Sequence, residues 1–155
     1  MKSFVLGDIH GNIKALHQVI ERSRINKDTD ELIFLGDVCD GWYWTRECID
    51  ELLTFKNLKL IWDRDLWRSF APKGVHPVIH SGQDTRVERI FLGHTTVQTD
   101  PYVFPPPEKR NNVWNLDTGA GYTGKLTIMD VETEDYWQSE PCIQLYPGEY
   151  SLREL

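Results

Sequence analysis

Short apolar runs alternate with helical patterns over the first part of the chain. Residues 3–6 and 32–35 form runs that each stop at Gly-Asp, as buried parallel strands do where they open into a loop. Asn12 stands where a helix N-cap is expected, and residues 59–62 read as a third strand. The apolar positions that mark the two intervening helices are Ile13, Leu16, Ile20, Cys48, Ile49, Leu52 and Leu53. The pattern predicts β-α-β-α order, and therefore an α/β fold.

The second half of the chain is predicted to be rich in β-strand. Residues 90–92 form another apolar run, which ends in Gly-His. Consecutive prolines at 105–107 force an extended loop, because proline cannot donate a hydrogen bond to a sheet. The runs that follow read as antiparallel strands: 113–116, 125–130 and 135–138. Residues 147–155 show no periodicity, so we expect this tail to be loosely held.

Composition and charge narrow the function classes. With 155 residues, of which 40% are hydrophobic, the chain suits one domain spanning residues 1–155. The net charge of −7 and the scattered basic residues disfavour a nucleic-acid partner. The three cysteines form no Cys-x-x-Cys pair, so we expect neither a disulfide framework nor a thiolate zinc site, and a reducing cytoplasm fits best. No stretch resembles a signal peptide or a membrane span, so we expect a soluble protein with no membrane partner.

Polar residues follow three of the predicted strands at their carboxyl ends. Asp8 and His10 come after the first strand, Asp37 after the second and His94 after the strand at 90–92. In open α/β sheets such positions converge on one crevice. One Asp or His at a strand end is most simply a loop cap, but four together indicate a metal site. Two carboxylates and two imidazoles suit manganese, iron or zinc rather than calcium.

Glycines adjoin all four of these candidate ligands. They are Gly7, Gly11, Gly36 and Gly93. Glycine reaches backbone conformations that other residues avoid. We therefore interpret these glycines as sources of the freedom that tight turns around a bound ion need.

Three ordered motifs resemble the signature blocks of the calcineurin-like metallophosphoesterase superfamily. They are Gly7-Asp8-Ile9-His10-Gly11, Gly36-Asp37-Val38-Cys39-Asp40 and Gly93-His94-Thr95. The segments 115–120 and 124–127 resemble the closing part of its bacterial and phage serine/threonine protein phosphatase branch. One such motif alone is weak, but three in order with a closing block are specific. The resemblance covers most of the chain and implies a metallophosphoesterase-like α/β/β/α sandwich.

The resemblance also implies roles for individual residues. Asp8 and His10 would hold a first metal ion, Asp37 would bridge two ions, and His94 would bind the second. The cofactors would be divalent ions, manganese first with iron or zinc as alternatives, and two in a complete site. The implied reaction is hydrolysis of phosphomonoesters by metal-activated hydroxide. Its implied substrate is a protein that carries phosphoserine or phosphothreonine, or a small phosphoester.

The chain departs from the family pattern in its middle. No Gly-Asn-His block follows Asp37, although this block normally supplies a ligand to the second metal and the catalytic histidine. Another metal-binding histidine also lacks a counterpart, so a central section of the fold is expected to be missing, with the join near residues 57–60. Arg64 resembles a phosphate-binding arginine of the family. Asp40 would normally pair with the missing catalytic histidine.

Two alternatives stay open for the missing ligands. A different alignment of residues 59–62 places Asp63 or Asp65 at the asparagine position. His76 or His80 could replace the missing histidine, although exposed loop positions are the simpler interpretation. After Asp40, Gly-Trp stands where the branch usually has Arg-Gly, so one phosphate-binding arginine is absent.

Three functions stay open from the sequence. The first is a phosphatase that uses the residues above. The second is a non-catalytic or single-metal binding remnant of a phosphatase, which the lost ligands motivate. The third is a symmetrical dinucleoside tetraphosphatase, because such enzymes resemble the same branch. The missing section would leave apolar surface exposed, so a homo-oligomer or reduced stability is expected.

Overall fold

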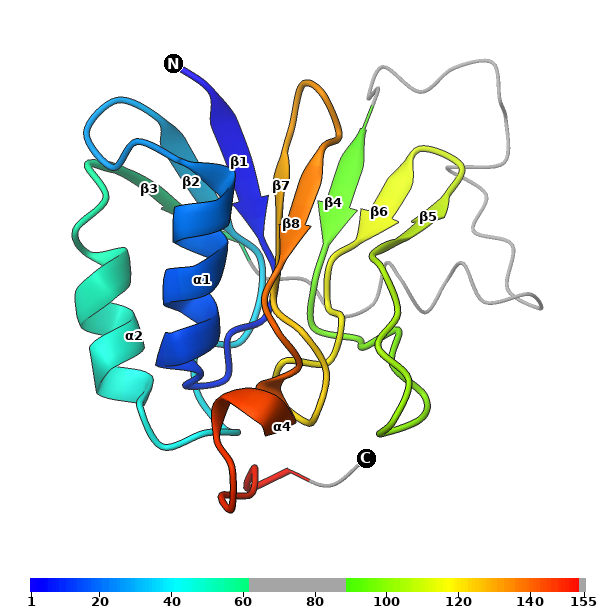
Figure 1. Ribbon diagram of the computed structural model, residues 1–155. Coiled ribbons are helices and arrows are strands. Elements are labelled where there is room, and N and C mark those ends of the chain that lie inside the picture. Colours follow the sequence, from blue (N-terminus) through cyan, green and yellow to red (C-terminus); the bar gives the residue numbers. More distant parts are fainter. Residues whose placement is uncertain (62–88, 154–155) are drawn as a thin grey trace.

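Two β-sheets form the framework of the protein. The computed structural model describes residues 1–61 and 89–153. The larger sheet has five strands in the order β3-β2-β1-β7-β8, and the smaller has three in the order β4-β6-β5 (Figure 1). The elements are β1 Ser3–Leu6, α1 Ile13–Ser23, β2 Glu31–Phe34, α2 Thr45–Leu52, β3 Asn57–Leu60, β4 Ile90–Leu92, β5 Glu108–Arg110, β6 Val113–Asn115, β7 Thr127–Asp130, β8 Tyr136–Gln138 and α4 Cys142–Leu145.

The five-stranded sheet is built around the apolar runs at the start of the chain. β1 pairs in parallel with β2, where Val5 lies opposite Ile33, and β2 pairs in parallel with β3. On its other side β1 pairs antiparallel with β7, where Val5 lies opposite Met129. Parallel strands need crossover connections, and α1 and α2 supply them. The predicted β-α-β-α order is confirmed, with the third strand at residues 57–60 rather than 59–62.

Helix α1 begins where the sequence places its N-cap. The side-chain oxygen of Asn12 accepts a hydrogen bond from the Ala15 N–H at 2.9 Å, which satisfies one of the donors left free at a helix start. Leu16 and Val19 of this helix are fully buried. The helix ends at Arg24, whose left-handed backbone (φ 55°) stops the chain from continuing the helix.

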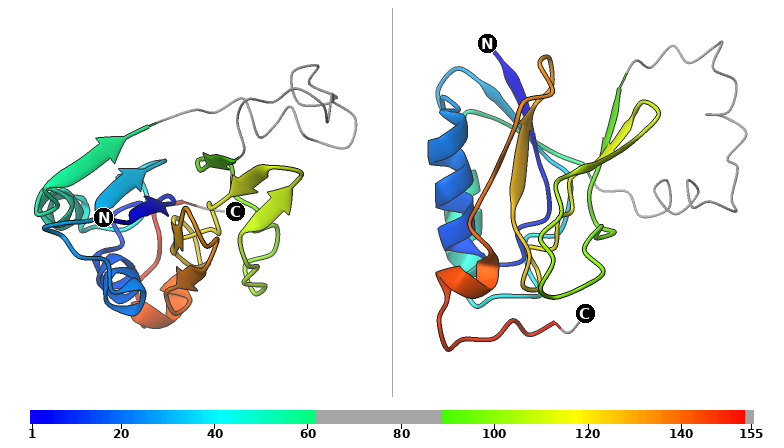
Figure 2. Two further views of the ribbon diagram at one scale, coloured as in Figure 1. Left: turned by 90° about the horizontal axis from the view of Figure 1, so that it is seen from above. Right: turned by 45° about the vertical axis from the view of Figure 1, so that its right-hand side comes forward.

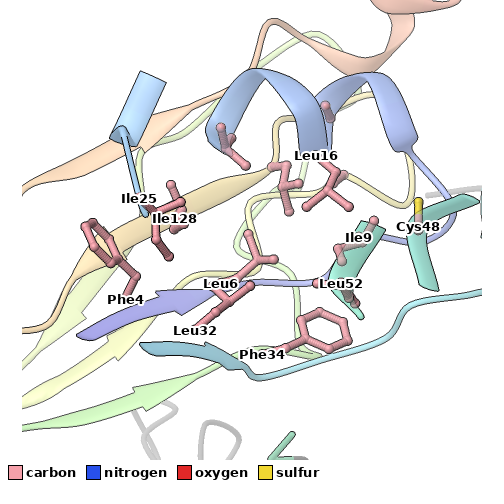
Figure 3. Close-up of a cluster of buried hydrophobic side chains, with 14 of the residues drawn as sticks. Phe4, Leu6, Ile9, Leu16, Ile25, Leu32, Phe34, Cys48, Leu52 and Ile128 are labelled. Carbon is pink, nitrogen blue, oxygen red and sulfur yellow. The ribbon is translucent and has the colours of Figure 1, made fainter. Parts of the chain in front are cut away.

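Alternate residues along the central strands enter two different cores. Leu6 and Ile128 face the helices and pack with Leu16 of α1 (Figure 3). Their neighbours along the strands face the opposite way, because side chains alternate between the faces of a sheet. These neighbours, Val5 and Met129, form a second cluster with Leu35 after β2 and Leu116 after β6, and Phe91 and Trp114 pack against it. The five-stranded sheet is therefore a middle layer, with helices on one side and the smaller sheet on the other (Figure 2).

The smaller sheet differs from the sequence prediction in two respects. β6 was expected to be antiparallel, but it pairs in parallel with β4 and antiparallel with β5. β5 has no apolar alternation, since its three residues are all charged, and its packing comes from Lys109, whose ammonium lies 5.0 Å from the centre of the Trp114 ring. The predicted antiparallel pairing of β7 with β8 is confirmed.

The mixed α/β fold class is confirmed. Helices α1, α2 and α4 lie on one side of the five-stranded sheet (Figure 2). Among the described residues, no helix covers the outer face of the smaller sheet, where the α/β/β/α arrangement has its second helical layer. None of the described helices has the length and apolarity needed to cross a bilayer.

Apolar side chains are exposed beside the edge strand β3. Leu53, Leu60 and Ile61 retain 70%, 69% and 54% of their accessible surface. Together with buried neighbours they line a pocket of about 410 Å³. This exposed apolar surface lies near residues 57–60, where the sequence comparison with the family predicts that a central section is missing. Self-association of the chain stays a prediction.

The three cysteines should differ sharply in reactivity. Cys39 is exposed, whereas Cys48 and Cys142 are buried. Burial raises the pKa of Cys48 to about 12 and raises the pKa of Cys142 as well, so neither forms an appreciable thiolate near pH 8. We expect one thiol per native chain to react rapidly with an aromatic disulfide reagent, and three after denaturation. Rapid reaction of two thiols in the native protein would contradict the burial of Cys48 and Cys142.

Candidate metal centre

The carboxyl ends of β1, β2 and β4 bring three candidate ligands together. Asp8 follows β1, Asp37 follows β2 and His94 follows β4, and the arrowheads of these strands point toward the lower side of the sheets in Figure 1. One ligand atom from each of the three lies within 4.8 Å of the others. Asp8 is buried, whereas the side chain of Asp37 is 25% exposed. Solvent therefore reaches the cluster at Asp37 but not at Asp8.

The carboxylate of Asp8 binds the backbone of both partners. Its Oδ1 accepts a hydrogen bond from the His94 N–H at 2.7 Å, and its Oδ2 accepts one from the Asp37 N–H at 3.2 Å. Each carboxylate oxygen keeps a further lone pair for another donor or a cation. A buried charge needs such partners, because leaving it unpaired costs several kcal/mol. Asp8 thus fixes the relative positions of the other two residues.

Two glycines leave space for this carboxylate. A Cβ atom at Gly36 would lie 2.1 Å from Asp8 Oδ1, and one at Gly93 would lie 2.4 Å from the same atom. Neither glycine has a positive φ, unlike Gly11 at +73°. The expectation that these glycines provide backbone freedom is therefore wrong for Gly36 and Gly93. They are needed for the close approach of Asp8.

His10 lies on the other side of Asp8. Its Nδ1 is 2.7 Å from the Cys39 carbonyl, and its Nε2 is 3.6 Å from Asp8 Oδ2. The carbonyl can only accept, so Nδ1 donates and Nε2 is directed toward the carboxylate. Metal-binding histidines are commonly oriented by such a hydrogen bond from the second ring nitrogen. The donor set and its orientation fit a divalent ion.

His94 completes the cluster through Asp37. Its Nδ1 lies 2.8 Å from Asp37 Oδ2, and its side chain is 6% exposed. His10 and His94 both have left-handed backbones, with φ of 52° and 68°. Residues other than glycine adopt this region rarely and at an energetic cost, although histidine does so more readily than most. The surrounding hydrogen bonds must therefore hold both histidines in place.

Buried charges shift the ionisation of the site. Burial alone would lower the pKa of His10, but the hydrogen bond and charge of Asp8, with the Cys39 carbonyl, more than offset it and raise this pKa above its ordinary value. Burial and the neighbouring Asp8 raise the pKa of Asp117 to about 8. The raised pKa favours the protonated, neutral form of Asp117 near pH 7, so this residue adds little negative charge to the site.

Sequence reasoning missed two residues at this centre. Asp117 is buried and lies two residues after the end of β6, where its Oδ1 accepts a hydrogen bond from the Gly119 N–H at 3.2 Å. Its position just after a strand, like that of Asp8 and Asp37, could have marked it as a candidate site residue. Arg153 comes from the tail that was expected to be loosely held, yet its guanidinium lies 2.9 Å from His10 Nε2. No local pattern marks that contact.

The remaining predicted residues divide into two groups. Asp40 lies next to the centre but is 72% exposed, and its carboxylate is 3.9 Å from the Arg153 guanidinium. It also has a left-handed backbone, with φ of 68°. The others lie outside the described residues: Arg64, Asp63, Asp65, His76 and His80.

Filling the space at Gly93 should weaken metal binding. In Gly93→Ala the added methyl group would displace the Asp8 carboxylate, and we expect affinity for Mn²⁺ to fall by about 10- to 100-fold. Titration calorimetry would measure this. Gly148→Ala is the control, because its φ of +79° strains the new side chain while no atom lies within 4 Å. Unchanged affinity in Gly93→Ala would contradict the role given to this glycine.

The first half of the chain matches a known family. A family model described as calcineurin-like phosphoesterase matches residues 1–80, which is more than half of the 155 residues. The matched part contains Asp8, His10 and Asp37. No curated protein sequence matches the chain. The chain belongs to the calcineurin-like phosphoesterase family.

Proposed function

We propose that this protein is a metal-dependent phosphomonoesterase. The observation that carries the proposal is the convergence of Asp8, Asp37 and His94 within 4.8 Å, with His10 Nε2 a further 3.6 Å from Asp8. Family membership supports phosphoester chemistry that depends on metal ions. The net charge of −7 favours a monoester substrate over the polyanionic backbone of a nucleic acid.

The four residues would hold the ions from two sides. Asp8 and His10 are buried and fixed by backbone contacts, whereas Asp37 is partly exposed and faces the open side. Bound divalent ions, for which manganese is our first choice, would neutralise phosphate oxygens and lower the pKa of a nucleophilic water. Two ions would be expected if the site is complete.

Among the residues that the structure describes around Asp40, none replaces the family's proton donor for the leaving group. Asp40 would pair with the catalytic histidine of the family, but the chain has no Gly-Asn-His block. Instead the Asp40 carboxylate lies 3.9 Å from the Arg153 guanidinium, which cannot give up a proton. The site should therefore act best on leaving groups that depart without a proton.

Two considerations bear on the natural substrate. Resemblance to the serine/threonine protein phosphatase branch favours phosphoserine and phosphothreonine in a phosphorylated protein. The absence of a Gly-Asn-His block favours aryl esters, because a phenolate is a better leaving group than an alkoxide. Both are phosphomonoesters, and both fit the metal centre described above.

Manganese content and activity should depend together on Asp8. In Asp8→Asn the loss of charge removes a metal ligand, and we expect hydrolysis of an aryl phosphate to fall by at least about 100-fold, with fewer bound ions per chain. Elemental analysis and a colorimetric assay would measure the two effects. Asp28→Asn, on an exposed loop where Asp28 pairs with Lys56, is the matched control. At most one bound ion and no turnover in the wild type would instead support a non-catalytic remnant.

The wild-type protein should discriminate between leaving groups. We expect manganese-dependent hydrolysis of p-nitrophenyl phosphate at least about 100 times faster than that of an alkyl phosphate, because general acid catalysis contributes about 10²- to 10⁴-fold where it is present. Initial rates under the same conditions would test this. Similar rates on the two esters would show that a proton donor exists after all.

A further inference from the structure

The end of the C-terminal segment, residues 151–153, packs beside the metal centre. The Leu152 N–H donates a hydrogen bond to the Gly41 carbonyl at 2.8 Å, and the Ser151 hydroxyl donates to the Gly121 carbonyl. Figure 1 shows this segment passing below the strand ends that carry the candidate ligands. The segment therefore brings the side chain of Arg153 to the site.

Arg153 is held at the edge of the centre by three neighbours. One guanidinium nitrogen lies 2.9 Å from His10 Nε2 and 3.1 Å from Nδ1, so it sits over the ring rather than in line with either nitrogen. The Asp40 carboxylate is 3.9 Å away, and the centre of the Tyr122 ring is 5.3 Å from the guanidinium carbon. The side chain remains 27% exposed. A fixed and accessible guanidinium suits a phosphate oxygen.

A pocket of about 430 Å³ opens beside Arg153. This volume falls within the range of about 300–1,000 Å³ typical of small-molecule sites. Three of its lining residues are aromatic: Trp42, Tyr122 and Tyr150. Among the described residues that line it, the only charged ones are Arg153 and Glu149.

We propose that Arg153 binds the substrate phosphate and that this pocket, lined by Trp42, Tyr122 and Tyr150, receives the aromatic ring of an aryl phosphate. The inference rests on the proposed phosphomonoesterase function and names aryl phosphates, including phosphotyrosine, as its substrate class. Aromatic walls favour an aromatic group through stacking and burial. Glu149 would repel a second phosphate, which argues against a dinucleoside polyphosphate.

Phosphonates test the pocket without any turnover, because their carbon–phosphorus bond resists hydrolysis. We expect the manganese-loaded protein to bind phenylphosphonate at least about 10-fold more tightly than methylphosphonate in titration calorimetry. Equal affinities, or no binding of either compound, would overturn the inference. A protein that binds phenylphosphonate selectively but hydrolyses no phosphoester would retain the pocket and lose the proposed function.

Two variants separate the phosphate contact from the aromatic contact. Arg153→Ala should lower the affinity for both phosphonates by at least about 10-fold. Arg46 is an exposed arginine of α2, and Arg46→Ala should change neither affinity. Tyr150→Ala should lower the affinity for phenylphosphonate by about 5-fold or more and leave the affinity for methylphosphonate unchanged. Tyr136→Ala on β8 should change neither affinity. Tighter binding in Arg153→Ala would show that Arg153 obstructs the site, and would overturn the assignment.

Discussion

The buried carboxylate of Asp8 is the interaction on which the rest of the site depends. It joins the ends of three strands from two sheets, because it accepts hydrogen bonds from the backbone after β2 and after β4. Gly36 and Gly93 have no side chain where the carboxylate passes. The same Asp8 carboxylate would also bind a cation. Stability of the strand ends and metal affinity are therefore coupled at one residue.

Backbone hydrogen bonds support the strained residues around Asp8. The Ile9 and His10 N–H groups both donate to the Asp37 carbonyl, at 2.8 and 3.0 Å. On the other sheet the Leu116 N–H donates to the Leu92 carbonyl at 2.8 Å, just before the loop that carries His94. Left-handed histidines persist only where the surroundings determine their conformation. The hydrogen bonds of the two sheets hold His10 and His94 in this conformation.

The sequence predicted those features that local patterns encode. Apolar runs and helical spacing located β1, α1, β2 and α2, and the strand-end rule selected Asp8, Asp37 and His94, which the fold places together. It could not locate β5, which has only charged residues, or α4, which has four residues. The contact between Arg153 and His10 spans 143 positions, and no local pattern encodes such a contact. The steric role of Gly93 was hidden for the same reason.

Electrostatics would link metal binding to phosphate binding in this site. Asp8 and Asp37 belong to the metal cluster and Asp40 lies next to it, while Arg153 is the one cation that the described residues place beside His10. A phosphate dianion approaching that set without ions would be repelled. Divalent ions would reverse the sign of the local potential. Metal loading should therefore govern phosphate affinity itself as well as the rate of hydrolysis, and Arg153 would act only once the carboxylates are neutralised.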